Sequence, residues 1–234
     1  MSRSEDLLSE QLLYYRHGAA QYDAANRSLL NADDADGRSR REGRAHATEA
    51  LAVAKDRSVL EIAGGTGVYT EMLAQIAGDL TVVDASPESL DINRQATAGA
   101  PVAVRYIESD IFDWTPTDHY EVVAFAFWLS HVPTDAFERF WSLVDRCLTK
   151  DGTVVIIDAG EPAHAASQED NVNFFSEDRV DESTSVRYLQ DGTAYRIVRV
   201  LWNREQLADE LARLGWTVEF APAEWLIGHV HRTA

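Results

Sequence analysis

A glycine-rich turn and three acidic residues stand where polar groups of a small ligand could be held. The stretch EIAGGTGVYT, residues 61–70, follows a short apolar run, and its glycines permit a tight turn and a close approach of the backbone to a ligand. The amide groups at the start of a following helix are free to bind that ligand. Glu61 precedes the turn, Asp84 stands in VVDAS and Asp110 in ESDIFDW. These residues predict a small-molecule site.

The elements that must position these residues are parallel strands covered by helices. Short apolar runs alternate with segments of helical period over most of the chain, a pattern typical of an α/β sheet. In a doubly wound sheet, ligands bind outside the carboxyl ends of the strands. The strands are expected near Ser58–Ile62, Leu80–Asp84, Val102–Ile107, Glu121–Phe127 and Thr153–Asp158, with a closing pair near Thr217–Ala221 and Trp225–Val230.

Local signals predict where the helices of this sheet begin. Ser86 followed by Pro87 fits an N-cap and a first helical residue, and Pro133 is expected to open a second helix. Asn203 with Gln206 resembles a capping box. A further helix is expected from the end of the glycine turn, near Val68.

We expect one domain with additions at the binding edge of the sheet. The additions are a helical cap before the first strand and a lid after the fifth. In the lid, Asp191-Gly192 predicts a two-residue type I′ hairpin that sets Tyr188 opposite Tyr195. The predicted division is 1–56 helical cap, 57–160 cofactor-binding core, 161–201 lid with the hairpin, and 202–234 C-terminal helix and closing strands.

Charge and cysteine content restrict the classes of partner. The net charge of −18 disfavours nucleic acid and anionic membranes as partners. A single cysteine excludes an intramolecular disulfide, and no spacing of His, Asp or Glu suggests a metal site. Without an apolar signal core or a long apolar run, we expect a soluble cytoplasmic protein. Monomer and homodimer both remain open.

The acids indicate which ligand the turn holds. Glu61 would lie near a cationic amino group, Asp84 would accept hydrogen bonds from a ribose diol, and Asp110 with Ile111 would meet an adenine ring. A ligand with these three parts and no phosphate is S-adenosylmethionine. A dinucleotide turn would carry a third glycine where this chain has Thr70, although a nicotinamide oxidoreductase remains an alternative.

The chain resembles the class I S-adenosylmethionine-dependent methyltransferases of the small-molecule type. The resemblance rests on VLEIAGGTGVYT, LTVVDASPESL, YIESDIFDW and AFAFWLSHVP, which follow the order and spacing of that family over roughly residues 58–160. It implies a Rossmann-like doubly wound sheet of seven strands, in the order 3-2-1-4-5-7-6 with the last strand antiparallel. It also implies S-adenosyl-L-methionine as cofactor and S-adenosyl-L-homocysteine as product.

The resemblance also implies site residues. One tyrosine of the segment LLYYRHGAAQYD is expected at the methionine end of the cofactor, and the sequence does not choose among the three. The residues expected to bind the cofactor are Tyr14, Tyr22, Glu61, Ala63, Gly64, Gly65, Thr66, Gly67, Asp84, Ala85, Asp110, Ile111, Phe127 and Trp128. Those expected to bind the acceptor are Tyr15, Trp128, His131, Asp158, Phe174 and Tyr188.

The expected reaction is methyl transfer to a small-molecule acceptor, on oxygen or, less favoured, on nitrogen or carbon. An in-line displacement needs alignment and a dry site, and a base only if the acceptor keeps its proton. His131 is the candidate base, or else it orders the turn of a helix entry; Asp158 binds the acceptor or satisfies backbone amides. The alternative is a cofactor-binding fold used for a non-methylating reaction such as cyclisation, or for regulatory ligand binding.

Overall fold

Seven strands form one sheet in the computed structural model, which describes residues 3–30, 35–160 and 177–233. The sheet order β3-β2-β1-β4-β5-β10-β9 confirms the predicted topology, and β10 runs antiparallel to both β5 and β9. The strands are β1 Ser58–Ile62, β2 Asp79–Asp84, β3 Val104–Glu108, β4 Tyr120–Ala126, β5 Leu148–Asp158, β9 Trp216–Phe220 and β10 Leu226–Arg232.

The sheet is buried on both faces because its apolar side chains alternate between two cores. On one face, Leu60 and Phe125 pack with Trp141 of α5 (Phe137–Cys147), and all three are almost fully buried. On the other face, Val59 and Val122 belong to a second core beneath α2 (Ala35–Leu51). Residues buried on both sides are typical of central parallel strands.

The helix starts match the local sequence signals at two places and differ at two. The side chain of Ser86 accepts a hydrogen bond from Ser89 N at the start of α4 (Pro87–Ala96), and Asn203 caps α7 (Arg204–Arg213) in the same way. After Pro133, a 3₁₀ turn comes first and α5 begins only at Phe137. The helix after the glycine turn, α3 (Thr70–Leu73), starts two residues later than expected, and Met72 N there forms a 3₁₀-type bond to Tyr69 O.

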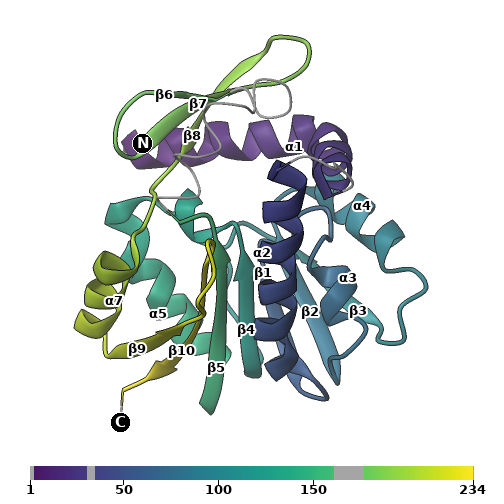
Figure 1. The fold of residues 1–234 in the computed structure, drawn as a ribbon, viewed down its shortest axis with the longest axis vertical. Coiled ribbons are helices and arrows are strands. Elements are labelled where there is room, and N and C mark those ends of the chain that lie inside the picture. Colours follow the sequence, from purple (N-terminus) through teal and green to yellow (C-terminus); the bar gives the residue numbers. More distant parts are fainter. Residues whose placement is uncertain (1–2, 31–34, 161–176, 234) are drawn as a thin grey trace.

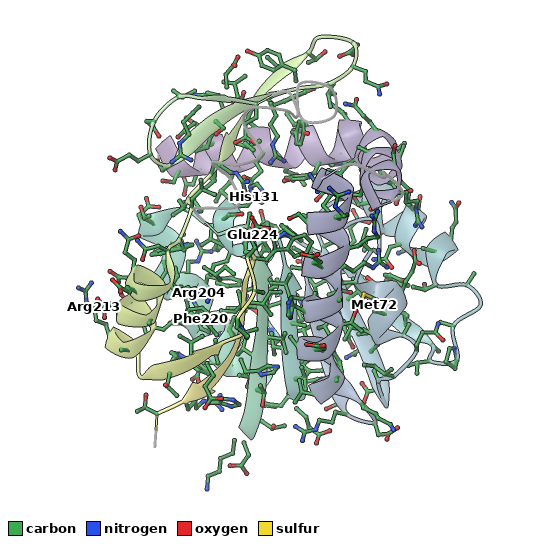
Figure 2. The ribbon with its side chains drawn as sticks, in the orientation of Figure 1. Met72, His131, Arg204, Arg213, Phe220 and Glu224 are labelled. Atoms are coloured by element: carbon green, nitrogen blue, oxygen red, sulfur yellow. The ribbon has the colours of Figure 1, made fainter. Side chains whose placement is uncertain are left out.

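A helical cap lies across the carboxyl ends of the strands, as Figure 1 shows. Its helix α1 (Arg3–Leu30) crosses this edge of the sheet, and α2 descends along one face. At the far side of the sheet, Arg204 of α7 lies 5.7 Å from the ring centre of Phe220 in β9 (Figure 2). Within the described ranges, no helix combines the length and the apolar character needed to span a bilayer.

The lid is a three-stranded antiparallel sheet above α1, with β6 (Glu177–Arg179), β7 (Thr184–Tyr188) and β8 (Ala194–Val198) (Figure 1). The predicted register is wrong by one residue: Tyr188 pairs with Ala194, and Tyr195 pairs with Arg187. Leu189 N bonds Thr193 O, so three residues form the loop, and Gly192 takes the left-handed conformation at φ 85°. Such a loop is a common alternative to the two-residue turn, and its extra residue shifts the pairing.

Gln11 of α1 joins the cap to the lid and to the loop after β4. Its buried side chain donates to the carbonyl of His131 (3.3 Å) and accepts from the amide of Val198 (3.0 Å). One side chain therefore satisfies two backbone groups in segments that are remote in sequence. Buried backbone groups that lose their partners are costly, so this contact sets how α1 seats on the protein.

We predict that Gln11→Ala lowers the free energy of unfolding by about 2–5 kcal/mol, because two buried backbone groups lose their partner. Urea denaturation measures this change. The matched control is Gln21→Ala on the same helix, where the side chain accepts from the exposed amide of Gln190 and its loss is expected to cost less than about 1 kcal/mol. Equal losses in the two variants would contradict the bridging role of Gln11.

Candidate functional site

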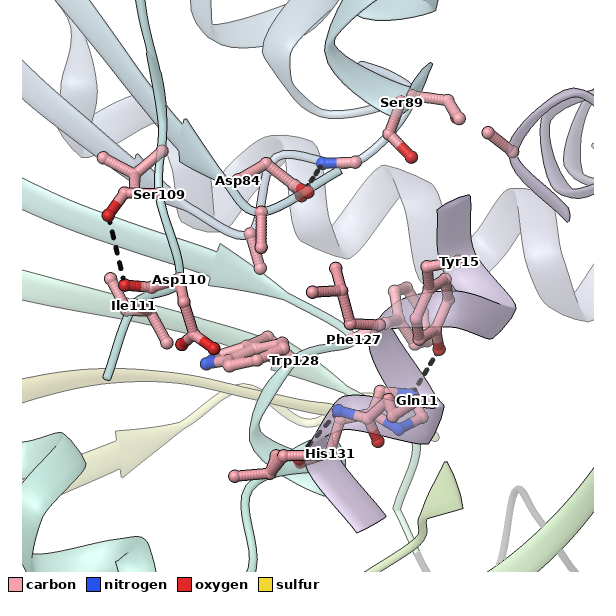
Figure 3. Close-up of a pocket in the computed structure, with 18 of the residues that line it drawn as sticks. Gln11, Tyr15, Asp84, Ser89, Ser109, Asp110, Ile111, Phe127, Trp128 and His131 are labelled. Carbon is pink, nitrogen blue, oxygen red and sulfur yellow. Dashed lines mark hydrogen bonds between the residues drawn. The ribbon is translucent and has the colours of Figure 1, made fainter. Parts of the chain in front are cut away.

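A cavity lies between α1 and the carboxyl ends of β1, β2 and β4. It brings together residues from the cap, the glycine turn, the ends of three strands and the loop after β4. Tyr15 and His131 lie together in Figure 3, apart from Asp84 and Asp110. The lining residues are Leu8, Gln11, Leu12, Tyr15, Ala19, Tyr22, Ala63, Gly65, Thr66, Val83, Asp84, Ala85, Ser89, Ser109, Asp110, Ile111, Phe112, Ala126, Phe127, Trp128 and His131.

The carboxylate of Asp84 organises the glycine turn. Its Oδ2 accepts from the amide of Gly65 (2.9 Å) and its Oδ1 from the amide of Ser86 (2.8 Å), so it links the ends of β1 and β2. Gly65 has φ 53°, and the space beyond its Cα is open. Burial raises the pKa of Asp84, while the two backbone amides oppose that shift. The turn therefore presents backbone and carboxylate together to the cavity.

Two residues without glycine's freedom also take left-handed backbone conformations at this edge. Ala63 has φ 54° and Phe127 has φ 51°, and each directly follows its strand, β1 or β4. This conformation costs an L-residue about 1–2 kcal/mol, so the surrounding structure must hold it. Both residues line the cavity, and backbone strain of this kind clusters at functional sites.

Asp110 and Ile111, which are expected from the sequence to contact adenine, follow β3. Both line the cavity after β3, and Oδ1 of Asp110 accepts from the amide of Phe112 at 2.8 Å. Phe112 itself packs near Trp128, with ring centres 6.5 Å apart. The structure thus assembles one carboxylate and flat apolar groups at this end of the cavity.

Glu61 is not among the lining residues. The residue is 2% exposed beneath the turn, where its Oε2 accepts from Thr70 Oγ1 at 2.5 Å. Burial raises the pKa of Glu61 to about 8; the bond from Thr70 lowers it and the nearby Asp84 raises it further. Glu61 is therefore largely protonated at neutral pH.

Asn93 of α4 is a positioning residue that sequence reasoning missed. Its fully buried amide donates to the carbonyl of Gly65 (3.2 Å) and to Thr70 Oγ1 (2.8 Å). Its Oδ1 accepts from the hydroxyl of Tyr106 at 2.8 Å. The available signal was a polar residue on the apolar face of a helix, three positions after Leu90.

His131 is held at both ring nitrogens. Nδ1 lies 2.8 Å from the carbonyl oxygen of Val198, and Nε2 lies 2.9 Å from the hydroxyl of Tyr15. Burial lowers the pKa of His131 to about 3, and the charges of Arg187 and Arg199 lower it in the same direction. The imidazole is therefore neutral at physiological pH.

Helix geometry separates the three tyrosines of the cap. Tyr15 and Tyr22 line the cavity, seven residues apart on one face of α1. Tyr14 points to the lid instead, with its ring 5.8 Å from the guanidinium of Arg187 and 6.1 Å from the ring of Tyr195. Leu8, Leu12 and Ala19 share the face of Tyr15, and sequence reasoning missed them although helical spacing would have found them.

A buried ion cluster of the lid lies behind Tyr15. Arg187 Nε is 2.9 Å from one oxygen of Glu177, and Arg199 Nε is 3.4 Å from the other. Burial alone would raise the pKa of Glu177, but the two guanidinium groups lower it to about 2. Arg187 also donates to the Tyr15 hydroxyl at 3.3 Å, which connects this cluster to the cavity.

Other residues expected in the site lie outside its lining. Asp158 is buried, and its carboxylate accepts from the amides of Ser130 (2.9 Å) and Ala159 (2.7 Å), so it holds the loop that carries His131. Tyr188 is bonded to Asp178 on the lid at 2.7 Å. Phe174 lies outside the described residues. Tyr14, Glu61, Gly64, Gly67, Asp158 and Tyr188 are absent from the described lining.

Comparisons with known proteins find a matching family and similar solved structures. A family described as "Methyltransferase domain" matches residues 59–152. The structure of the DhpI-SAM-HEP complex is 31% identical, with 99% of each chain covered and a TM-score of 0.77. The DhpI-SAH complex is 29% identical over 100% of this chain and 99% of that one, with a TM-score of 0.76.

More distant relatives share the core of the chain. The ubiquinone/menaquinone biosynthesis C-methyltransferase UbiE of Azotobacter vinelandii is 28% identical over 153 residues, which cover 63% of this chain and 57% of that protein. This chain spans about half the length of the curated relatives it matches. A 1,6-didemethyltoxoflavin-N1-methyltransferase of Burkholderia thailandensis shares the fold at 17% identity, with 92% and 91% coverage and a TM-score of 0.55.

We predict that Gly67→Ala destabilises the protein by about 1–3 kcal/mol. Its φ of 96° disfavours any side chain, and an added Cβ would lie 2.9 Å from Cγ of Asn93. Urea denaturation measures the loss. Gly99→Ala is the control, since nothing lies within 4 Å of its Cβ position, and an equally large loss there would contradict the assignment.

The raised pKa of Glu61 predicts how stability depends on pH. Glu61 loses its proton near pH 4.5 in the unfolded chain but only near pH 8 in the folded protein. Between these two pH values, the free energy of unfolding therefore falls as the pH rises. From pH 6.5 to 8, wild-type protein should lose about 1–2 kcal/mol more stability than Glu61→Gln. His131 does not change the free energy of unfolding between pH 6.5 and 8, because its lowered pKa makes stability depend on pH only below about 6.5. Parallel pH profiles in denaturation would refute the prediction.

Proposed function

Since the chain belongs to the class I S-adenosylmethionine-dependent methyltransferases, we propose that it methylates an oxygen atom of a small-molecule acceptor. S-adenosyl-L-methionine is the methyl donor and S-adenosyl-L-homocysteine the product. The single observation that carries the proposal is one cavity that joins the glycine turn and Asp84 to a separate pair, Tyr15 and His131. A cofactor and an acceptor thus have adjoining places.

The residues around the glycine turn fit this cofactor. Asp84 suits a ribose diol and Asp110 with Ile111 suits adenine, since all three line the cavity. Thr66 also lines it, and its Oγ1 is buried without a hydrogen-bond partner in the part of the chain described. A buried hydroxyl without a partner is costly, and a bound polar ligand relieves that cost.

The chemistry that the cofactor supplies is a methyl group on a sulfonium, which an acceptor's lone pair takes by in-line displacement. The protein's own contribution is alignment and exclusion of water. α1 covers the cavity with Leu8 and Leu12, and Phe127 and Trp128 line it below. His131 is neutral and hydrogen-bonded at both ring nitrogens, so it is a weak base. This favours a role in ordering the site over a role as general base.

An uncharged oxygen nucleophile suits the acceptor end better than an amine. Amines bind as ammonium ions, which need a nearby carboxylate. The acids of the described lining, Asp84 and Asp110, lie apart from Tyr15 and His131 (Figure 3). Nitrogen and carbon remain the less favoured targets, and UbiE, a relative, is named as a C-methyltransferase.

The cap and lid favour a discrete, enclosed acceptor. We propose that the protein acts in the cytoplasm and has neither nucleic acid nor a membrane as its partner. A non-methylating or regulatory use of the same cofactor is the competing function.

We would measure binding of S-adenosyl-L-homocysteine and NAD by calorimetry, then transfer of labelled methyl to panels of phenols, alcohols, carboxylic acids and amines. Tight cofactor binding with label found only in unreacted cofactor would sink the methyltransferase proposal; NAD binding without S-adenosyl-L-homocysteine binding would overturn the cofactor.

We predict that Asp84→Asn weakens S-adenosyl-L-homocysteine binding by about 10- to 100-fold. The amide NH₂ would oppose an amide of the turn, and a charged hydrogen-bond acceptor is lost. Calorimetry provides the measurement. Asp91→Asn is the control, because Asp91 is exposed on α4 and pairs only with Arg94 among described contacts. Unchanged affinity in the Asp84 variant would remove Asp84 from the binding site.

A further inference from the structure

The carbonyl of Val198 decides which nitrogen of His131 carries the proton. A carbonyl oxygen only accepts hydrogen bonds, and it lies 2.8 Å from Nδ1, so Nδ1–H is the donor. In a neutral imidazole the other nitrogen then has a free lone pair. Nε2 is therefore an acceptor, and its partner at 2.9 Å is the hydroxyl of Tyr15.

The groups around the ring keep it in this neutral state. Tyr15 faces it from α1, and Arg187 and Arg199 act on it from β7 and the segment after β8. Glu177 of β6 is the opposing charge, and it is itself paired with both arginines. Desolvation and two cations disfavour a second proton on the ring, so both nitrogens keep fixed roles.

These contacts orient the hydroxyl of Tyr15. Its single hydrogen points to Nε2 of His131, and one lone pair of its oxygen accepts from Arg187 at 3.3 Å. A phenolic oxygen has two lone pairs, so one remains. Tyr15 lines the cavity, and this last site on its oxygen is the one available to a ligand.

We propose that Tyr15 is a catalytic residue that accepts a hydrogen bond from the nucleophilic group of the acceptor, with His131 and Arg187 as the positioning residues that aim its oxygen. The carbon–sulfur bond of the donor breaks as the new bond to the acceptor forms, and the acceptor's proton is then lost to water. This proposal rests on the methyltransferase function proposed above and adds a selection rule. An acceptor group at this point must donate a hydrogen, as a hydroxyl or N–H does. An already ionised oxygen would meet the lone pair of Tyr15 and be disfavoured.

The orientation is tested by NMR on protein with ¹⁵N-labelled histidine, saturated with S-adenosyl-L-homocysteine at pH 7. Long-range ¹H–¹⁵N correlation is expected to show His131 with a proton on Nδ1 and none on Nε2; His131→Gln assigns its signals among the seven histidines. Tyr15→Phe should shift the Nε2 signal of His131 toward that of an unbonded nitrogen and leave the tautomer unchanged. A proton on Nε2, or an Nε2 signal indifferent to Tyr15→Phe, would overturn the proposal.

The selection rule is tested with phenol and its methyl ether, anisole, which cannot donate. In the complex with S-adenosyl-L-homocysteine, wild-type protein is expected to bind phenol about threefold to tenfold more tightly than anisole. The Tyr15→Phe variant is expected to bind the two compounds equally well. Equal binding by wild type would overturn the rule. Tyr195→Phe is the matched control and should keep the preference, because the Tyr195 hydroxyl lies 2.8 Å from Nδ1 of His17 and Tyr195 is not among the residues described as lining the cavity.

These outcomes separate the two proposals. If S-adenosyl-L-homocysteine binds and label is transferred while Nε2 carries a proton, the function stands and the role of Tyr15 fails. If the cofactor product does not bind at all, the function itself fails. If the Tyr15→Phe variant still binds S-adenosyl-L-homocysteine with the wild-type affinity, measured by calorimetry, the variant is folded.

Discussion

The site depends on β1 pairing in parallel with β2 on one side and β4 on the other. The chain leaves β1 and β4 in left-handed backbone at Ala63 and Phe127, at the edge of the sheet where the cavity lies. Asp84 then ties the turn after β1 to the end of β2 through two backbone amides. Polar groups converge there because the sheet order places these ends together.

A second level of organisation closes this cavity. Buried polar groups must be satisfied, so α1 seats where Gln11 meets the backbone of the His131 loop and of β8 at once. The same helix position brings Leu8, Leu12 and Tyr15 over the cavity. The cap, the lid and the loop after β4 are therefore joined by the hydrogen bonds of Gln11, a residue that itself lines the cavity.

Much of the core was predictable, because apolar periodicity and capping residues act locally. The seven strands, the Ser86 and Asn203 caps and the residues of the glycine turn were found in this way, and Asp84, Asp110 and His131 line one cavity. The register of the lid strands could not be predicted, since the same Asp-Gly pair fits a loop of two or of three residues. Asn93 was missed for a similar reason, as its role exists only through its contacts.

The sequence by itself determined the α/β class, the family and the position of the glycine turn, because these follow from short-range patterns at the ends of strands. Only the tertiary structure decided that Tyr15 and Tyr22, but not Tyr14, face the cavity, and that Glu61 lies beneath the turn. It also decided the state of His131, since burial, two arginines of the lid and the Val198 carbonyl act on it from residues more than fifty positions away. Charge and proton position depend on surroundings in space, which a residue's neighbours in sequence do not specify.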